Sequence, residues 1–157
     1  MKRLNEGATI EIRYVTKPDA ERVSELCHQL GYETTVDEIE SRLRSMLGNR
    51  ANAVFVAEID GGVVGWIQVE MRSVIESGEF GEITGLVVDG RFRRRGIASR
   101  LVKRAEEWSL DSGLNRIRVR TNLIRAESHP FYRSMGFVET KTQAVYQKTL
   151  KKEVARS

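Results

Sequence analysis

The stretch from residue 81 to residue 122 constrains the fold most, because it predicts two strands joined through one helix. The first strand, "GEITGLVV" (81–88), is apolar on both faces in its second half, as a central strand is. An amphipathic helix follows and ends near Gly113, and "NRIRVRTN" (115–122) then alternates as a second strand. Strands joined by such a crossover lie parallel in one sheet, which indicates an α/β fold.

The rest of the chain supplies antiparallel partners and covering helices. The remaining predicted elements are a strand at 9–15, helices at 16–31 and 35–48, a hairpin of strands at 53–59 and 63–71, a short helix at 126–136 and a final hairpin at 137–150. No repeat or linker interrupts them. We therefore expect a single domain over 1–157 on a mixed sheet, with its core at about 8–150 and a frayed tail at 151–157.

Charge and composition exclude several classes of protein. The net charge of +4 suits an anionic ligand but is too small to imply nucleic acid without a concentrated patch. No apolar run approaches the ~20 residues of a membrane span, and the first residues lack the apolar core of a signal peptide. The single cysteine, Cys27, cannot form an intrachain disulfide, so a cytoplasmic location is expected.

The basic turn "RFRRRGIA" (91–98) is the strongest candidate for a binding site. It lies between the central strand and the helix, whose N-terminal N–H groups and dipole attract phosphate. Gly96 and Ala98 allow a ligand to approach the backbone, and arginines pair with phosphate oxygens. The turn has neither the Gly-Lys-Ser/Thr of a P-loop nor Gly-x-Gly-x-x-Gly. Taken alone it can be a phosphate cradle, a solvated basic turn or a nucleic-acid patch.

Three segments together resemble the GNAT superfamily of N-acetyltransferases. "RRRGIA" (93–98) resembles the family's Arg/Gln-x-x-Gly-x-Gly/Ala acetyl-CoA signature, and residues 82–108 resemble its fourth strand, turn and third helix. "RVRTN" (118–122) resembles its fifth strand, and "AESHPFYRSMGF" (126–137) is similar to its A-x-x-FY-x-x-x-GF segment. The order of elements agrees over roughly residues 8–150.

The resemblance implies a fold and a binding mode for acetyl-CoA as co-substrate. It implies a mostly antiparallel sheet of six to seven strands with about four helices, in which the fourth and fifth strands splay apart around acetyl-CoA. The main chain of Leu86, Val87 and Val88 would run beside the pantetheine arm, with a bulge that Gly85 permits. The pyrophosphate would lie on Arg93, Arg94, Arg95, Gly96, Ile97, Ala98 and Ser99. Asn122 matches a position that often contacts the cofactor, and it can equally be a strand-end asparagine.

Three residues are candidates for proton transfer. Tyr132 matches the family's tyrosine, so the resemblance makes it a contact of acetyl-CoA and the general acid; the alternative is a packing role. Glu82 stands where some members place a catalytic base, although many use a water chain and a surface role is possible. His129 is a second proton-handling candidate, or a helix cap. Two histidines and one cysteine show no metal-ligand spacing, so no metal is expected.

The implied activity is transfer of an acetyl group from acetyl-CoA to a primary amine of a small molecule, by direct attack in a ternary complex. An acidic cluster would suit a cationic acceptor or only a solvated helix; it comprises Glu33, Asp37, Glu38 and Glu40. "LGYETTVDEIESRL" (30–43) resembles small-molecule acetyltransferases, including some that modify aminoglycosides. Protein or peptide amines remain an alternative, as does a non-catalytic module that binds acyl-CoA or nucleic acid. A homodimer, common in the family, is possible.

Overall fold

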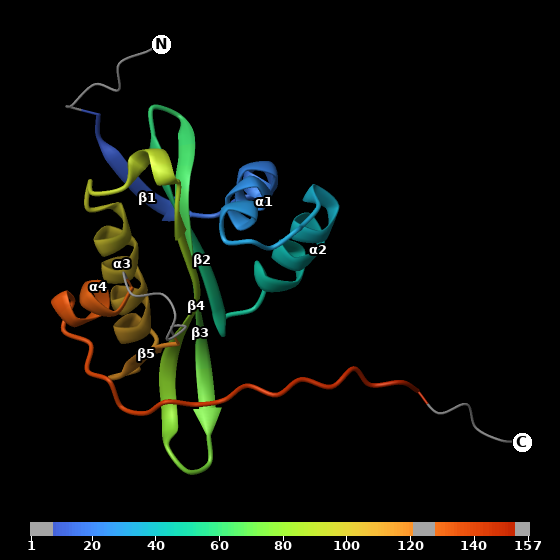
Figure 1. Cartoon of the computed structure of the whole chain (residues 1–157), viewed down its shortest axis with the longest axis vertical. Coiled ribbons are helices and arrows are strands. Elements are labelled where there is room, and N and C mark those ends of the chain that lie inside the picture. Colours follow the sequence, from blue (N-terminus) through green and yellow to red (C-terminus); the bar gives the residue numbers. More distant parts are fainter. Residues whose placement is uncertain (1–7, 121–127, 153–157) are drawn as a thin grey trace, which may run out of the picture.

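The computed structural model describes residues 8–120 and 128–152, which form one mixed sheet with helices on both faces (Figure 1). The sheet has the strand order β1-β2-β3-β4-β5. Its strands are β1 (Ile10–Tyr14), β2 (Asn52–Ile59), β3 (Gly62–Val74), β4 (Gly78–Val88) and β5 (Ile117–Val119). The α-helices are α1 (Ala20–Gln29), α2 (Val36–Met46), α3 (Ile97–Asp111) and α4 (Ser128–Ser134), with short 3-10 turns η1 (Lys17–Asp19) and η2 (Gly90–Phe92).

Local sequence explains where these elements begin and turn. The predicted hairpin is confirmed: β2 and β3 are antiparallel, and Asp60 (φ 50°) and Gly61 (φ 81°) form the left-handed pair that a tight hairpin turn needs. Thr35 caps α2, since its hydroxyl accepts from the Glu38 N–H at 3.2 Å. β3 and β4 form a second hairpin, and both strands extend beyond the ranges 63–71 and 81–88 predicted from the sequence.

The strand that carries the candidate site has an irregular ladder. β4 is antiparallel to β3, and Gln68 lies opposite Gly85 whereas Val69 lies opposite Ile83. Thr84 is therefore the extra residue of a bulge, next to the glycine that suggested one. On its other side β4 is parallel to β5, as predicted, and within the described residues this pairing covers Gly81 to Ile83.

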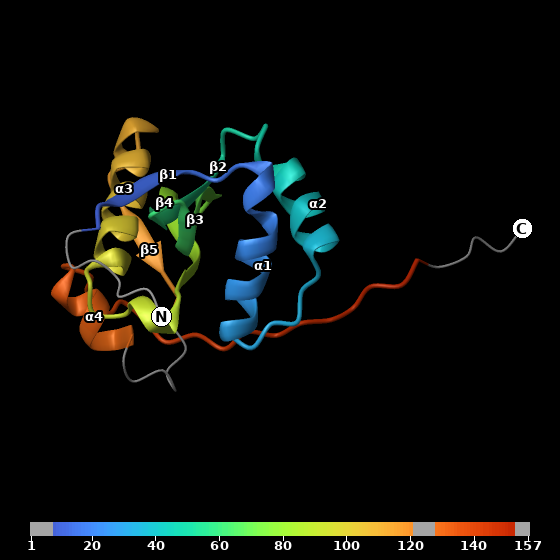
Figure 2. The ribbon, with the colours of Figure 1, turned by 90° about the horizontal axis from the view of Figure 1, so that it is seen from above.

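Two apolar layers enclose the sheet (Figure 2). One lies under α3 and contains the fully buried Phe55, Ile67, Leu101 and Val102. The other lies under α1 and α2 and includes Leu26, Leu43 and Val56. Because the apolar stripes of α1, α2 and α3 face the sheet, β4 is covered on both faces, as its continuous apolar run requires. No helix in the described part is long and apolar enough to cross a membrane.

The C-terminal prediction was wrong. Residues 8–120 and 128–152 contain five strands rather than six or seven, and the hairpin predicted at 137–150 is not formed. "FVETKTQAVYQKTL" has strand-forming side chains but no Gly, Pro, Asn or Asp, the residues that tight hairpin turns use. The segment therefore extends from the body as one length of chain (Figures 1 and 2).

Candidate active site

The basic turn lies at the carboxyl end of β4 and leads into the N-terminus of α3. Arg94 (φ 62°) and Gly96 (φ 74°) are both left-handed, so the backbone folds back tightly before the helix. Gly96 is the N-cap of α3 and no side chain caps the helix. A Cβ atom added at Gly96 would meet nothing within 4 Å, so the space above the turn is open. Such a turn presents backbone N–H groups to a ligand, as anion sites do.

Exposed arginine side chains surround this turn. Arg93, Arg94 and Arg95 are exposed, while Ile97 is 2% exposed and anchors the first helical turn in the core. The Arg95 guanidinium lies 5.5 Å from the centre of the Phe92 ring. Ala98 and Ser99 are half-buried on the same first turn. The predicted pyrophosphate residues are thus contiguous, and their donors and charges fit a diphosphate.

The end of β4 presents backbone groups on its side away from β3. Asp89 donates its N–H to the Val64 carbonyl oxygen at 2.8 Å, on the β3 side. Since strand N–H groups alternate in direction, those of Leu86 and Val88 point to the opposite edge and that of Val87 points toward β3. Of the three predicted main-chain contacts, Leu86 and Val88 are therefore the ones oriented to donate to a ligand beside β4.

Asp89 holds the turn in place, and the sequence analysis missed it. Its side chain is 1% exposed and contacts Arg91 at 2.9 Å and Arg22 of α1 at 2.8 Å. The Asp89 carboxylate also accepts from the Arg91 N–H at 3.0 Å. Hydrogen bonds from Arg91, then from Arg22, hold the pKa of Asp89 well below its usual value, although burial opposes this. In the sequence, the only sign of this role is that an aspartate directly follows an apolar strand.

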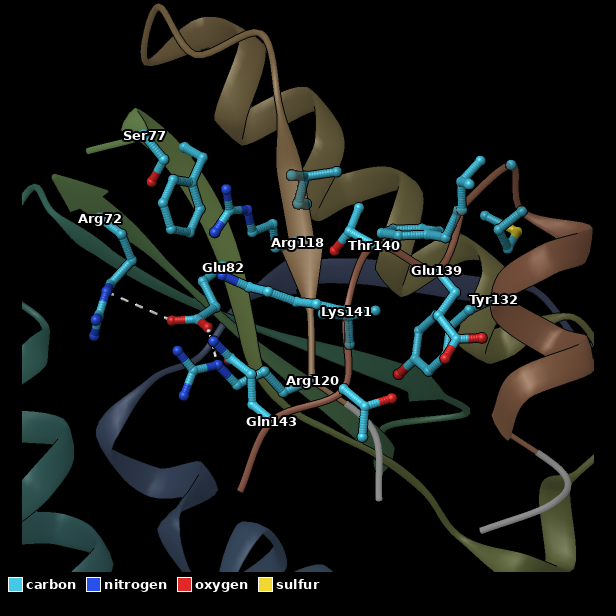
Figure 3. Close-up of a pocket in the computed structure, with 18 of the residues that line it drawn as sticks. Arg72, Ser77, Glu82, Arg118, Arg120, Tyr132, Glu139, Thr140, Lys141 and Gln143 are labelled. Atoms are coloured by element: carbon cyan, nitrogen blue, oxygen red, sulfur yellow. Dashed lines mark ion pairs between the residues drawn. The ribbon is translucent and has the colours of Figure 1, made fainter. Parts of the chain in front are cut away.

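A pocket of about 1270 Å³ lies between the start of β4, β5, α4 and the chain after α4 (Figure 3). Glu82, His129 and Tyr132, the three proton-transfer candidates, all line this pocket. His129 and Tyr132 come from α4 and are half-buried. Residues 137–143 form the facing wall. The acidic cluster on and before α2 does not line this pocket, and Asn122 lies outside the described residues.

Glu82 is buried and held by two cations. Its side chain is 6% exposed. Arg120 Nε lies 2.9 Å from Glu82 Oε1, and Arg72 Nε lies 3.6 Å from Glu82 Oε2 (Figure 3). A buried carboxylate needs such partners, because an unpaired charge is costly in the interior. The two arginines thus fix the position of Glu82 at the pocket.

Tyr132 projects from α4 toward the pocket (Figure 3). Its ring packs edge-on against Phe131 at 5.1 Å and Phe137 at 5.5 Å between ring centres. This aromatic contact fixes the ring, so the packing role considered from the sequence is present whatever else the hydroxyl does. Among the described residues, no group of three or more His, Cys, Asp or Glu is placed to hold a metal ion.

Comparison with known proteins agrees with this geometry. The model of the acetyltransferase (GNAT) family matches residues 18–137. Aminoglycoside N(6')-acetyltransferase type 1 of Serratia marcescens is 27% identical over 119 residues, which cover 73% of this chain and 82% of that relative.

Two solved structures have the same fold. Aminoglycoside N-acetyltransferase AAC(6')-Iy in complex with CoA superposes with a TM-score of 0.83 at 24% identity, covering 93% of this chain and 99% of that one. AAC(6')-Iy in complex with the bisubstrate analog CoA-S-monomethyl-acetylneamine superposes with a TM-score of 0.80 at 24% identity, covering 90% and 99%.

Proposed function

This chain belongs to the acetyltransferase (GNAT) family, and we propose that it transfers the acetyl group of acetyl-CoA to a primary amine of a small molecule, by direct attack within a ternary complex. The observation that carries the proposal is the turn from Val88 to α3, inside the matched residues, with its left-handed Arg94 and Gly96 and its uncapped helix. The relative from Serratia marcescens is named for an aminoglycoside acceptor, and one similar structure holds a CoA–acetylneamine analog. Both descriptions support a small-molecule amine as the acceptor.

The turn and β4 would hold acetyl-CoA, which supplies the thioester. The N–H groups at the start of α3 and the side chains of Arg93, Arg94 and Arg95 would bind its diphosphate. The outward N–H groups of Leu86 and Val88 would line the pantetheine arm as an added strand does. Of these two, the one next to the thioester would stabilise the negative charge that the thioester carbonyl oxygen gains during attack.

Proton transfer would fall to the residues of the pocket. An amine is mostly protonated at neutral pH, so a proton has to leave the acceptor before it attacks. Glu82 or His129 would take that proton, directly or through water. The Tyr132 hydroxyl would donate a proton to the departing thiolate.

The decisive experiment measures binding and turnover separately. Gly96→Glu should abolish acetyl-CoA binding in calorimetry, because it brings bulk and negative charge to the phosphate turn. Gly48→Glu, which makes the same change at an open position after α2, should bind normally. Tight binding by Gly96→Glu would mean that the turn is not the phosphate site.

Turnover is followed as release of the CoA thiol with a panel of amines that includes aminoglycosides, polyamines, amino acids and peptides. Tyr132→Phe should lower kcat at least tenfold and leave the Kd for acetyl-CoA nearly unchanged. Tyr14→Phe, on the exposed side of β1, is the matched control. Unchanged turnover in Tyr132→Phe would exclude the tyrosine as the acid, and no turnover with any amine would contradict the proposed function.

Glu82 and His129 are separated by the pH profile of kcat/KM. If Glu82 is the base, Glu82→Gln should remove the fall of kcat/KM at acid pH and His129→Gln should not. If His129 is the base, the two variants should behave the other way round. A variant that only loses stability would keep the shape of the profile. If both variants keep the wild-type profile, the proton leaves through water without either side chain.

A further inference from the structure

Arg118 is a half-buried cation of the pocket that has no part in the proposed proton transfer. It is the middle residue of β5, between Ile117 and Val119, which pack against the core under α3. Because side chains alternate along a strand, Arg118 projects from the opposite face of the sheet. There it lines the same pocket as Glu82 and Tyr132 (Figure 3).

An aromatic ring holds the Arg118 guanidinium in place. Its central carbon, Cζ, lies 4.0 Å from the centre of the Phe80 ring, and Phe80 is 3% exposed in β4. Stacking on a ring uses the flat side of a guanidinium and leaves the N–H groups in its plane able to donate. The group is therefore fixed before a ligand arrives, and its fork of donors matches the two oxygens of a carboxylate.

The arginines next to Arg118 are already paired with carboxylates (Figure 3). Arg120 contacts Glu82 at 2.9 Å, and Arg72 lies 3.6 Å from Glu82 and 3.3 Å from Glu70. Among the residues that the structure describes, no ion pair joins Arg118 to a carboxylate, although Glu82 is its register partner on β4. Charges taken out of water are normally paired, so a ligand that brings an anion would complete this site.

The other carboxylates that line the pocket do not change this balance. Glu139 pairs with Arg133 at 3.9 Å as the chain leaves α4. Glu76 is exposed in the turn between β3 and β4, and Glu106 belongs to α3, on the other face of the sheet. Lys141 in the facing wall adds a further cation. The pocket on this face of the sheet is therefore cationic, and it would repel an acceptor with several positive charges.

We propose that the acceptor is a small amine that also carries a carboxylate, as free amino acids do, and that Arg118 binds this carboxylate. This inference rests on the proposed function, since it gives the acceptor of that transfer a chemical class. Glu82 and Arg118 lie opposite each other on strands about 4.8 Å apart, so a short molecule can place its amine near one and its carboxylate on the other. The amine loses a proton, its nitrogen bonds to the acetyl carbon as the C–S bond breaks, and the CoA thiolate takes up a proton.

Acceptor selectivity of the parent chain is the first test. Release of the CoA thiol is followed with the common amino acids, with their carboxamides, and with spermidine and an aminoglycoside. A carboxamide is the same amine without the negative charge, so kcat/KM for the best amino acid should exceed that of its own carboxamide by about tenfold or more. If a carboxamide, spermidine or the aminoglycoside matches the best amino acid, the inference is wrong and acetyl transfer to an amine still stands.

Arg118→Gln tests the residue itself. The change removes the charge and the fork of donors, so KM for the best amino acid should rise by about tenfold or more while kcat changes little. The preference for the amino acid over its carboxamide should also be lost. Arg116→Gln is the matched control, because Arg116 contacts the same Phe80 ring at 5.7 Å and is not part of the pocket lining.

The Kd for acetyl-CoA shows whether each variant keeps its fold. A folded Arg118→Gln chain that retains the selectivity of the parent would contradict the assignment of Arg118. If this variant does not fold, the comparison of amino acids with their carboxamides on the parent chain still decides the class of acceptor.

Binding separates this inference from the proposed function. Calorimetry titrates the same amino acids into the chain alone and into the chain saturated with CoA, where no acetyl group can move. Binding that Arg118→Gln loses and Arg116→Gln keeps would support the carboxylate site even if no amine is acetylated. If none of the amino acids binds, the inference fails, whether or not the chain acetylates another amine.

Discussion

At the scale of single residues, Gly85 shows how closely β3 and β4 are fitted at the bulge. A Cβ atom added at Gly85 would lie 2.7 Å from Cη2 and Cζ3 of the Trp66 indole, closer than real contacts allow. The ring packs against the core under α1 and α2, so it cannot move aside without disturbing that layer. Gly85, which the sequence analysis associated with a bulge, thus lies beside the bulge and also against a tryptophan ring.

We expect Gly85→Ala to lower the free energy of unfolding by about 1–3 kcal/mol, the usual cost of overpacking a core. Urea unfolding at neutral pH measures this. Gly48→Ala is the control, since a Cβ there meets nothing within 4 Å. Equal stability of Gly85→Ala and the parent chain would mean that the indole has room to shift.

At the scale of elements, the buried Asp89 joins α1, the end of β4 and the basic turn. Arg22 reaches it from α1 and also donates to the Val63 carbonyl oxygen of β3 at 2.9 Å. The turn is thus tied to a helix on the opposite face of the sheet from α3. Helix and strand boundaries follow from sequence patterns, but this tie joins residues 67 positions apart, and no local pattern reports such a contact.

Asp89→Asn should cost about 1.5–3 kcal/mol of unfolding free energy, the range for hydrogen bonds to a charged group. The pKa of Asp89 is lower in the folded chain than the ordinary value of about 3.9. The charged carboxylate therefore contributes fully to the free energy of unfolding above that value, and this contribution is lost as pH falls toward the folded pKa. The difference between parent and variant should therefore shrink below about pH 4. The exposed Asp111→Asn is the control, and a difference that stays constant down to pH 2 would contradict this account.

At the scale of the whole molecule, sequence patterns predicted the mixed sheet, the parallel β4–β5 pair and the helices, because periodicity and turn residues are local signals. The predicted number of strands was wrong because of residues 137–150. Their side chains favour a strand, but a strand forms only where a partner strand is available elsewhere in the fold.

The three predicted proton-transfer residues, Glu82, His129 and Tyr132, line one pocket. Arg72 and Arg120, which hold Glu82, could not be inferred, since burial of a charge and its partners is a property of the fold.

Binding of CoA at the basic turn should raise the stability of the whole chain, since a ligand that binds only the folded state adds to the free energy of unfolding. At 100 times its Kd, CoA adds about 2.7 kcal/mol. For a chain of 157 residues this raises Tm by roughly 5 to 10 °C. Pantetheine lacks the diphosphate, so at the same concentration it should give a much smaller shift. The CoA shift should also weaken with added salt, because the arginines of the turn are exposed. Equal shifts from CoA and pantetheine would show that the turn does not bind the diphosphate.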